Sequence, residues 1–382
     1  MRVAINAFSA RRGGGQTYLV NLLQHLDEPC DLDITILAPE DLKLPEHPSI
    51  TRLNVKWPMA NPLLRAVWEK FKLPGLLEEL GAEVLFCPGG VINTKLPKGC
   101  KSVTMFRNMV PFDMVVRKRY PLGMMRVRNW LLEHAMLSSM TGADLVIFIS
   151  DYARGVIERR ARGSIRNAVT IPHGISDHFR IASDARPKKP GWLPDGEYLL
   201  YVSIFDVYKH QLEVVQGFHQ LKSRRETKEK LVLAGHQLEP LATEVLKEIR
   251  QLGLENDVIL TGNIPYRELP AVYANAKINI FASSCENCPN ILLEALGAGR
   301  PLLVSQMKPM PEFGGDAVVY FDPLSPDDFC KQLLAIIDSP EELDRLGRMA
   351  GSRAEMYDWS ETARRTWRAI RQVGLGFLLS QP

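Results

Sequence analysis

Regular cysteine and histidine spacing is missing from this chain of 382 residues. The six cysteines follow no repeated pattern, which favours a reducing cytosol over a disulfide framework. Cys285 and Cys288 have the spacing of half a zinc site, but no second Cys or His pair completes it. The segment Asp31-Leu-Asp33 has the Asp-x-Asp spacing of a metal ligand pair, but it begins a predicted strand and is more typical of a solvated sheet edge. The sequence therefore predicts no metal site of these kinds.

Long hydrophobic runs, repeats and low-complexity tracts are also missing. No stretch approaches the ~20 consecutive apolar residues of a membrane-spanning helix. Residues 1–6 have the pattern of a strand, with no visible secretory signal peptide. We therefore expect a cytoplasmic protein.

Neither sign of charge is in large excess, since the net charge is +3, but the charges are unevenly spread along the chain. Residues 1–175 carry 23 Lys and Arg against 16 Asp and Glu, whereas residues 176–382 carry 24 against 28. The positive first half favours an anionic partner. No nucleic-acid-binding module accompanies this charge, so we expect no nucleic acid partner.

Short apolar runs alternate with amphipathic stretches along the whole chain. This alternation predicts an α/β protein whose parallel sheets are covered by helices on both faces. The predicted strands are 3–6, 34–38, 50–55, 84–87, 102–106, 145–149, 169–171, 198–202, 231–234, 258–261, 278–282, 302–305 and 318–321. The predicted helices are 16–26, 62–80 with a break at Pro74, 121–139, 150–162, 211–222, 241–252 and 268–275.

The length favours two domains joined by a polar, proline-containing linker. We expect an N-terminal domain over 1–180, a linker over 181–192, a second domain over 193–358, and a last helix over 359–382. Ser360 stands where a helix cap is expected.

The segment around Glu286 and Glu294 is the most informative in the chain. Seven residues separate the two carboxylates, and Pro289 is predicted at the first position of a helix that Gly297 helps to close. The helical rise puts the carboxylates roughly 12 Å apart along the axis. A nucleotide diphosphate-sugar has a hydroxyl-rich sugar at one end and a ribose at the other, so one carboxylate for each end suits such a ligand. A helix whose Glu294 merely faces solvent would give the same spacing.

This segment resembles the Glu-x7-Glu motif of the group 1 retaining glycosyltransferases. The resemblance covers most of the chain and is densest over 198–301. It implies the GT-B fold, in which two Rossmann-like domains with parallel sheets face each other across a cleft. It also implies a metal-independent, cofactor-free hexosyltransferase, with Glu294 on the ribose and Glu286 on the donor sugar. Asn290 belongs to the same motif and is expected to bind the donor.

Other donor-binding positions also follow from the resemblance. Lys209 matches the family lysine beside the diphosphate, although Ser203 and Ile204 replace the usual glycine and arginine. Further donor contacts are expected at Ser203, at Gly14 and Gly15 in a glycine-rich first loop, at His173 in a Pro-x-Gly turn, and at Asn263 near the base. The alternatives for these residues are a solvated lysine and plain turns.

Arg107 and Asn108 mark the clearest departure from the family. Many relatives have His-Asp at these two positions. Arginine does not act as a base at neutral pH, so Arg107 is expected to contact an anionic group of the donor or acceptor. This departure leaves open a non-catalytic nucleotide-sugar-binding protein, or a nucleotide-sugar epimerase of similar fold.

Two segments of the first half combine cations with large apolar residues. They are 114–120, with Arg117, Lys118 and Arg119, and 126–132, with Trp130. This pattern is typical either of a surface that rests on anionic lipid or of a basic flank beside core helices. With the positive first half, it suggests a saccharide or lipid-linked acceptor at the cytoplasmic membrane face, in polysaccharide or glycolipid synthesis.

Overall fold

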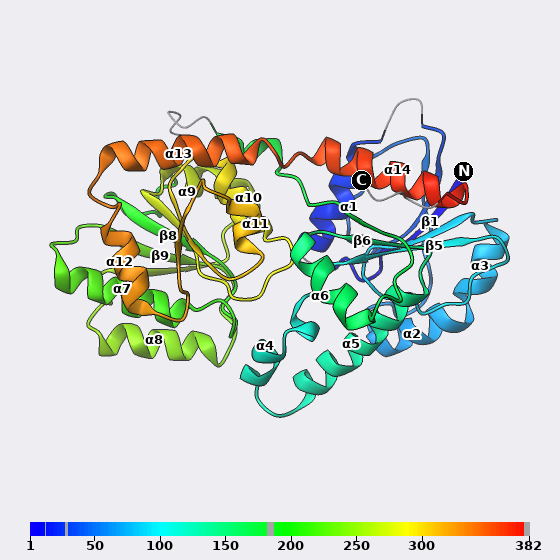
Figure 1. Ribbon diagram of the computed structural model, residues 1–382, viewed down its shortest axis with the longest axis horizontal. Coiled ribbons are helices and arrows are strands. Elements are labelled where there is room, and N and C mark those ends of the chain that lie inside the picture. The colour runs from blue at the N-terminus through cyan, green and yellow to red at the C-terminus, as the bar shows by residue number, and fades with distance from the viewer. Residues whose placement is uncertain (12, 27–29, 182–186, 378–382) are drawn as a thin grey trace. The chain divides into compact units, whose positions relative to one another are not determined.

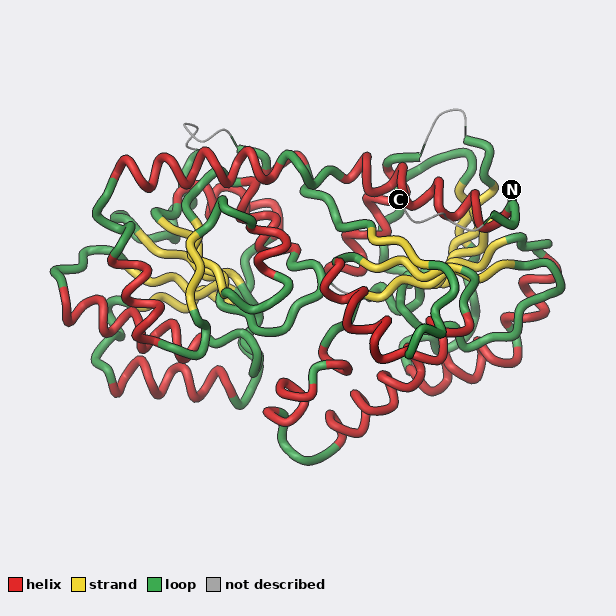
Figure 2. The backbone as a smooth tube through the Cα atoms, in the orientation of Figure 1, coloured by secondary structure: helices red, strands yellow, loops and turns green. Residues whose placement is uncertain are grey.

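The computed structural model describes residues 1–11, 13–26, 30–181 and 187–377. Two compact units result: the first contains 1–112, 121–174 and the C-terminal segment from Trp359, and the second contains 113–120 and 175–358. Part of the predicted linker, 182–186, lies outside the described residues. In each unit, helices lie on both sides of one sheet (Figure 2).

The first unit is built on a seven-stranded sheet, and every strand pair that the structure describes in it is parallel (Figure 1). The strand order is β3 (Ile50–Arg52), β2 (Asp33–Leu37), β1 (Arg2–Asn6), β4 (Val84–Cys87), β5 (Lys101–Phe106), β6 (Leu145–Phe148) and β7 (Ala168–Thr170). The helices are α1 (Gly14–Gln24), α2 (Pro62–Phe71), α3 (Leu73–Glu79), α5 (Met124–Gly142), α6 (Asp151–Ala161) and α14 (Trp359–Gly374).

The second unit is built on a six-stranded parallel sheet. The strand order is β10 (Val258–Gly262), β9 (Lys230–Ala234), β8 (Tyr198–Val202), β11 (Ile278–Phe281), β12 (Leu302–Ser305) and β13 (Val319–Phe321). The helices are α4 (Met114–Arg119), α7 (Gln211–Arg224), α8 (Leu241–Gln251), α9 (Leu269–Asn275), α10 (Asn290–Gly297), α11 (Met310–Gly314), α12 (Pro326–Leu334) and α13 (Pro340–Ala354).

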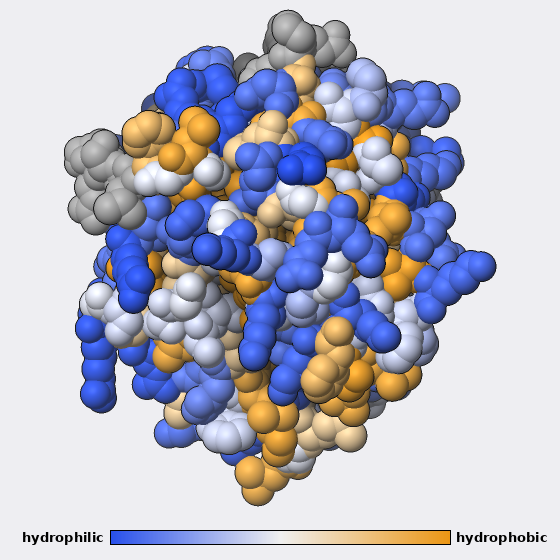
Figure 3. All heavy atoms as spheres, turned by 90° about the vertical axis from the view of Figure 1, so that its right-hand side faces the viewer, coloured by the Kyte–Doolittle hydropathy of each residue, from blue (hydrophilic) through white to orange (hydrophobic). Residues whose placement is uncertain are grey.

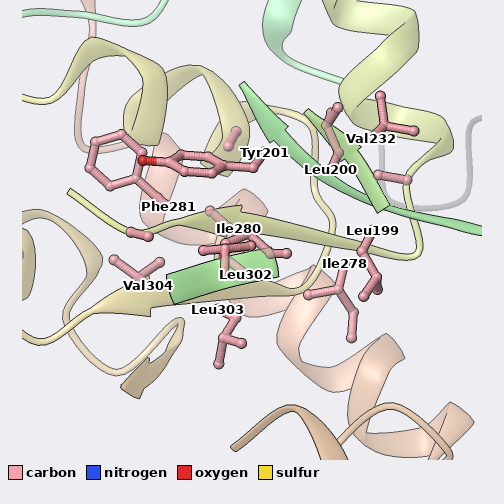
Figure 4. Close-up of a cluster of buried hydrophobic side chains, with 14 of the residues drawn as sticks. Leu199, Leu200, Tyr201, Val232, Ile278, Ile280, Phe281, Leu302, Leu303 and Val304 are labelled. Carbon is pink, nitrogen blue, oxygen red and sulfur yellow. The ribbon is translucent and has the colours of Figure 1, made fainter. Parts of the chain in front are cut away.

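These two parallel sheets confirm the predicted fold class. The strands are apolar almost throughout because helices cover both faces of each sheet. Figure 4 shows this core in the second unit, where side chains from β8, β9, β11 and β12 meet, among them Tyr201, Ile280 and Leu302. All three are fully or almost fully buried.

Helix boundaries agree with the sequence at some positions and differ at others. Pro74 lies in the first turn of α3, so the predicted break between two helices is confirmed. Pro289 is the residue before α10 rather than its first position, and Ser360 lies inside α14 rather than capping it. Both predictions were wrong by one position. Pro289 has ψ 84°, which is not helical, and α14 already begins at Trp359.

The last helix packs on the first unit through α1. Trp367 is buried, and its Nε1 donates to the carbonyl of Leu22 at 3.1 Å. Arg371 pairs with Asp31 at 2.7 Å, and this contact lowers the pKa of the Asp31 carboxyl. The Asp-x-Asp segment therefore has a structural partner at Asp31.

The segment 113–120 groups with the second unit, although the sequence placed it in the first domain. Arg119 donates to the carbonyl of Val207 at 3.2 Å, and the Tyr120 hydroxyl donates to Asp206 at 3.0 Å. Residues 175–180 group there too, since Arg180 donates to the carbonyl oxygens of Ala354 and Tyr357.

Candidate active site

Lys209 and Glu286 form an ion pair at the carboxyl ends of β8 and β11, which are neighbours in the second sheet. The two side chains are 6% and 17% exposed. Lys209 Nζ also lies 5.0 Å from the ring centroid of Tyr208 and 5.4 Å from that of Phe281. The aromatic rings and the carboxylate both attract the ammonium and so hold it in place. The pair therefore places a fixed cation and a fixed anion side by side at the edge where parallel sheets bind ligands.

His210 connects the two loops that carry this pair. Its Nδ1 lies 3.1 Å from a carboxylate oxygen of Glu213 in α7, and its Nε2 lies 2.8 Å from Oγ of Ser284. The backbone N–H of Ser284 donates to the carbonyl of Tyr208 at 2.9 Å. His210 holds this position with φ +55°, which L-residues rarely adopt. A strained backbone at the start of α7 is thus tied to the loop that ends in Glu286.

Glu294 lies in α10, one helical turn beyond Asn290, which is the first residue of that helix. The Tyr266 hydroxyl donates to its carboxyl oxygen at 3.2 Å. Burial raises the pKa of Glu294 to about 8, while hydrogen bonds with Tyr266 and Tyr273 partly oppose this rise. A carboxyl group with this pKa is mostly protonated at neutral pH, and it ionises more readily when a ligand offers hydrogen bonds to the carboxylate.

An opening of about 370 Å³ lies at the end of β10. Asn263, Ile264, Pro265 and Trp192 are among its lining residues. Tyr266, which donates to Glu294, follows Pro265 directly in the chain. Trp192 is half-exposed, and its Nε1 donates to Glu268 at 3.1 Å. An aromatic face beside apolar side chains and a few polar groups is the usual lining of a pocket for a flat organic ring.

Ser203 lies directly after β8, and its backbone N–H donates to the carbonyl of Ala234 at 2.8 Å. Gly235, the residue after Ala234, lies so close to Ser203 that a Cβ on it would come within 2.1 Å of the Ser203 carbonyl oxygen. The ends of β8 and β9 therefore pack backbone to backbone. Ser203 itself is buried at this junction.

The first unit presents the glycine loop and Arg107 together. Gly13 precedes α1 with φ +60°, a conformation that glycine adopts without strain. Gly14 and Gly15 form the first turn of α1, and a Cβ at Gly15 would lie 3.6 Å from a guanidinium nitrogen of Arg107. Arg107 also lies 5.3 Å from the ring centroid of Tyr18. The N-terminus of α1 and the Arg107 guanidinium therefore lie close together. Both attract negative charge, so this place suits an anionic group.

Asn108 and His173 have structural contacts within the first unit. The Asn108 side chain accepts from the N–H of Val110 at 3.2 Å and thereby closes a turn. His173 is buried, with ring centroids 5.3 Å from Tyr18 and 5.4 Å from Trp359. His173 therefore packs between α1, which carries Tyr18, and the start of α14 at Trp359.

Cys285 and Cys288 occur as free thiols, and burial raises the pKa of Cys285. Among the described residues, no group of three or more His, Cys, Asp or Glu is arranged to hold a metal ion. Within the same residues, no helix is both long and apolar enough to cross a membrane.

Comparison with known proteins matches these two units to two family profiles. The profile "Glycosyl transferases group 1" matches residues 183–353, and "Glycosyltransferase Family 4" matches residues 12–179. The chain belongs to the group 1 glycosyltransferases.

Individual relatives are distant in sequence. The O-antigen chain mannosyltransferase B of Escherichia coli is 25% identical over 63% of this chain and 64% of its own length. The matched region thus spans just under two thirds of that relative.

Solved structures extend the likeness of fold over nearly the whole chain. Sucrose-phosphate synthase from Thermosynechococcus elongatus covers 98% of this chain and 100% of its own, with a TM-score of 0.76 and 16% identity. The Anabaena protein HepE, solved in complex with UDP-glucose, covers 97% of this chain and 100% of its own, with a TM-score of 0.70 and 12% identity. The fold is therefore the GT-B fold predicted from the sequence.

Three residues of the second unit were missed by the sequence reasoning. His210, Tyr266 and Trp192 join the candidate site through contacts with residues far away in the sequence. The position of His210, directly after Lys209 and at the start of a helix, was the one available signal.

Proposed function

We propose that this glycosyltransferase transfers a hexose from a nucleotide diphosphate-sugar to a saccharide or lipid-linked acceptor, with retention of the anomeric configuration. The observation that carries the proposal is the grouping of Lys209, Glu286 and Glu294 within one unit. The ion pair supplies a cation for the diphosphate and a carboxylate for the sugar hydroxyls. Glu294, held by the Tyr266 hydroxyl, supplies the hydrogen-bond acceptor for the ribose.

The catalytic role of Lys209 follows from charge development. When the bond between the sugar and the diphosphate breaks, negative charge grows on the leaving diphosphate. A buried ammonium stabilises that charge more strongly than water does, because its position is fixed beforehand. Glu286 holds both the ammonium and the donor sugar, so its carboxylate links the position of the cation to that of the reacting carbon.

The names of relatives support the choice of donors to test. The E. coli relative is a mannosyltransferase, and HepE was solved with UDP-glucose. Mannose and glucose are therefore the first donor sugars to test, and an O-antigen-like polysaccharide is the first acceptor class.

A thermal-shift screen of UDP-glucose, GDP-mannose and dTDP-glucose tests the donor assignment. A ligand that binds only the folded state raises the melting temperature in proportion to the logarithm of its concentration. We expect one nucleotide-sugar to raise it more than its nucleoside or free sugar does. No shift with any of the three would contradict the assignment.

Turnover then separates the enzyme classes. A transferase consumes the bound donor faster when an acceptor saccharide is present, and proton NMR of the product reports retention or inversion. Conversion of the donor into its epimer without an acceptor would instead indicate an epimerase. Binding without any turnover would indicate a binding protein.

A membrane-facing role is supported by Leu122 and by the first two turns of α5, which follow it. Leu122 and Met124 are 85% and 87% exposed, and Val127, Trp130 and Leu131 are each at least half-exposed. Arg126 and Arg128 alternate with these apolar residues. Figure 3 shows apolar residues along the lower edge of the view. We propose that this helix rests on an anionic lipid surface.

Vesicle co-sedimentation tests this membrane contact. Binding to phosphatidylserine-containing vesicles should fall as ionic strength rises, since each cation contributes only ~1 kcal/mol near an anionic surface. Val127→Glu with Leu131→Glu should abolish it. The matched control is Leu324→Glu, which alters an exposed leucine of the second unit and should leave binding unchanged. Equal binding of all variants would contradict the proposal.

A further inference from the structure

A separate pocket opens at the carboxyl edge of the first sheet, formed by the loops that follow β1, β2 and β3. Its volume is about 350 Å³. Phe8 and Arg11 come from the first loop, Glu40 and Asp41 from the second, and Trp57 from the third. None of the residues assigned to the donor site lines it.

The pocket is preformed by contacts in its floor and walls. Phe8 and Met59 are both buried members of a hydrophobic cluster that includes Trp68, and the rings of Phe8 and Trp68 meet edge to face at 5.9 Å. The Arg52 guanidinium donates to the carbonyl oxygens of Pro39 and Leu42 and so holds the second loop. A ligand would therefore find this site largely in its bound shape.

Trp57 forms an aromatic wall whose polar edge is already used. Its Nε1 donates to the carbonyl of Leu64 in α2 at 2.9 Å, which fixes the orientation of the ring. The side chain is 37% exposed. A fixed, partly exposed indole face offers an apolar surface against which a ring with axial C–H groups can pack.

The charged residues of the pocket exclude several classes of ligand. Glu40 and Asp41 are exposed carboxylates, and among the described residues neither takes part in an ion pair or a side-chain hydrogen bond. Among the described residues that line the pocket, two carboxylates stand against the guanidinium of Arg11. The nearby guanidinium groups of Arg52 and Arg65 already donate to backbone carbonyls of the pocket loops. This balance disfavours a phosphate or an anionic lipid headgroup. The same three charges disfavour an alkyl chain. A neutral polyhydroxylated ring satisfies both the carboxylates and the indole.

We propose that this pocket binds a neutral sugar residue of the acceptor chain, at a distance from the sugar that receives the new hexose. The proposal rests on the proposed function for the identity of the acceptor. Arg107 meets the glycine loop that follows β1, and Phe8 and Arg11 of the same loop line the pocket. In the sheet, β2 and β3 lie on one side of β1 and β5 lies on the other, so the pocket extends from this loop away from β5. A longer acceptor chain that reaches Arg107 can therefore place a further sugar in the pocket, and we expect oligosaccharide acceptors to bind better than monosaccharides.

Saturation-transfer NMR with the donor-free protein tests the pocket. The probes are α1,2-linked and α1,3-linked mannotriose, maltotriose, mannose and glucose. We expect at least one trisaccharide to bind, and Trp57→Ala to weaken that binding about tenfold or more through loss of the stacking surface. Trp57→Phe should restore part of it.

The chain offers matched controls, because Trp130 and Trp192 are also half-exposed. Trp130→Ala and Trp192→Ala should leave trisaccharide binding unchanged. If Trp57→Ala does not fold, the double variant Glu40→Gln, Asp41→Asn takes its place and should also lose the trisaccharide. Failure of all five probes to bind, or equal binding by the wild type and these pocket variants, would overturn the proposal.

The outcome is separable from that of the proposed function. Trp57→Ala leaves the second unit intact, so its thermal shift with a nucleotide-sugar should match that of the wild type. Trisaccharide binding without any donor shift would support the pocket and contradict the donor assignment. A donor shift without trisaccharide binding would support the donor assignment and contradict the pocket.

Discussion

The two sheets of this protein have the same parallel architecture but very different carboxyl edges. In the second unit, buried polar side chains are paired: Lys209 with Glu286 in an ion pair, and His210 with Glu213 at 3.1 Å. In the first unit, the edge has a glycine loop, an exposed indole and exposed carboxylates. The edge of the second sheet is held by electrostatic contacts, whereas the edge of the first sheet is open and is shaped by its loops.

This difference suits the two substrates of a transferase. A nucleotide diphosphate-sugar is anionic and changes charge during the reaction, so its site gains from buried, preorganised charges. An acceptor saccharide is neutral and varies in length, so its site gains from shape, aromatic surface and exposed hydrogen-bonding groups. Variants that alter one edge should therefore affect one substrate only.

The largest expected effect comes from Lys209→Ala. Loss of a preorganised cation should lower turnover by about 100-fold or more. Removal of one partner from a buried ion pair also costs about 3 kcal/mol of the free energy of unfolding, because Glu286 is left without its partner. Steady-state kinetics and urea unfolding measure the two effects.

Lys277 is the matched control for this variant. It pairs with Glu229 at 2.6 Å in the same unit, and it does not belong to the candidate site. Lys277→Ala should lose stability but keep its turnover and donor affinity at a temperature where it is folded. Equal loss of turnover in both variants would mean that Lys209 acts through stability alone.

A smaller effect is expected at His210, where strain and hydrogen bonding oppose each other. His210→Ala loses the contacts with Glu213 and Ser284 and keeps a Cβ at φ +55°. His210→Gly loses the same contacts but relieves the strain, so it should be more stable than the Ala variant by about 1 kcal/mol. Urea unfolding of both variants checks this order. An Ala variant as stable as the Gly variant would show that the backbone is not strained.

Both His210 variants should also raise the KM for the donor. The loop that carries Glu286 would lose its link to α7, and binding would then have to order that loop. An unchanged donor KM would limit the role of His210 to folding.

The smallest expected effect is that of chelation. Lys209 is proposed to take the place of a divalent cation at the diphosphate. Donor turnover should therefore be the same with and without EDTA. Loss of activity with EDTA, restored by Mn²⁺, would show that the second unit lacks the charge to hold the donor alone.

The fold was readable from the sequence because a parallel sheet covered on both faces has apolar strands and amphipathic helices. All thirteen described strands were predicted, with ends that differ by at most a few residues. The helices α12 and α13 were missed, although Ser325 and Ser339 cap them and proline begins each one. The grouping of α4 with the second unit depends on contacts with Asp206 and Val207, and no local pattern predicts such contacts.

Sequence reasoning identified site residues only where a local motif marks them, without help from tertiary contacts. Lys209 and Glu294 followed from motif spacing. The strained backbone of His210 was not predictable, since histidine carries no signal of a positive φ. The burial of His173 also was not, because a Pro-x-Gly turn has the same sequence whether it is exposed or packed against Trp359. These properties arise from tertiary contacts.

The pKa of Glu294 provides a further test through pH. In the folded protein this carboxyl has a pKa of about 8, whereas an unperturbed glutamate has a pKa of 4.5. The folded state thus binds more protons than the unfolded state between these two values, so this group lowers the free energy of unfolding as pH rises through that window. Glu294→Gln should remove this part of the pH dependence.

Calorimetry of donor binding to the wild type and to Glu294→Gln tests the central claim most directly. If Glu294 accepts hydrogen bonds from the donor ribose, binding at pH 7 should release a proton, visible as a dependence of the binding enthalpy on the buffer. Glu294→Gln should lose that dependence and ~1.5–3 kcal/mol of binding free energy. The control is Glu244→Gln, which alters an exposed glutamate of α8 and should retain both the buffer dependence and the affinity. Donor affinity and proton release that are equal in all three proteins would contradict the account.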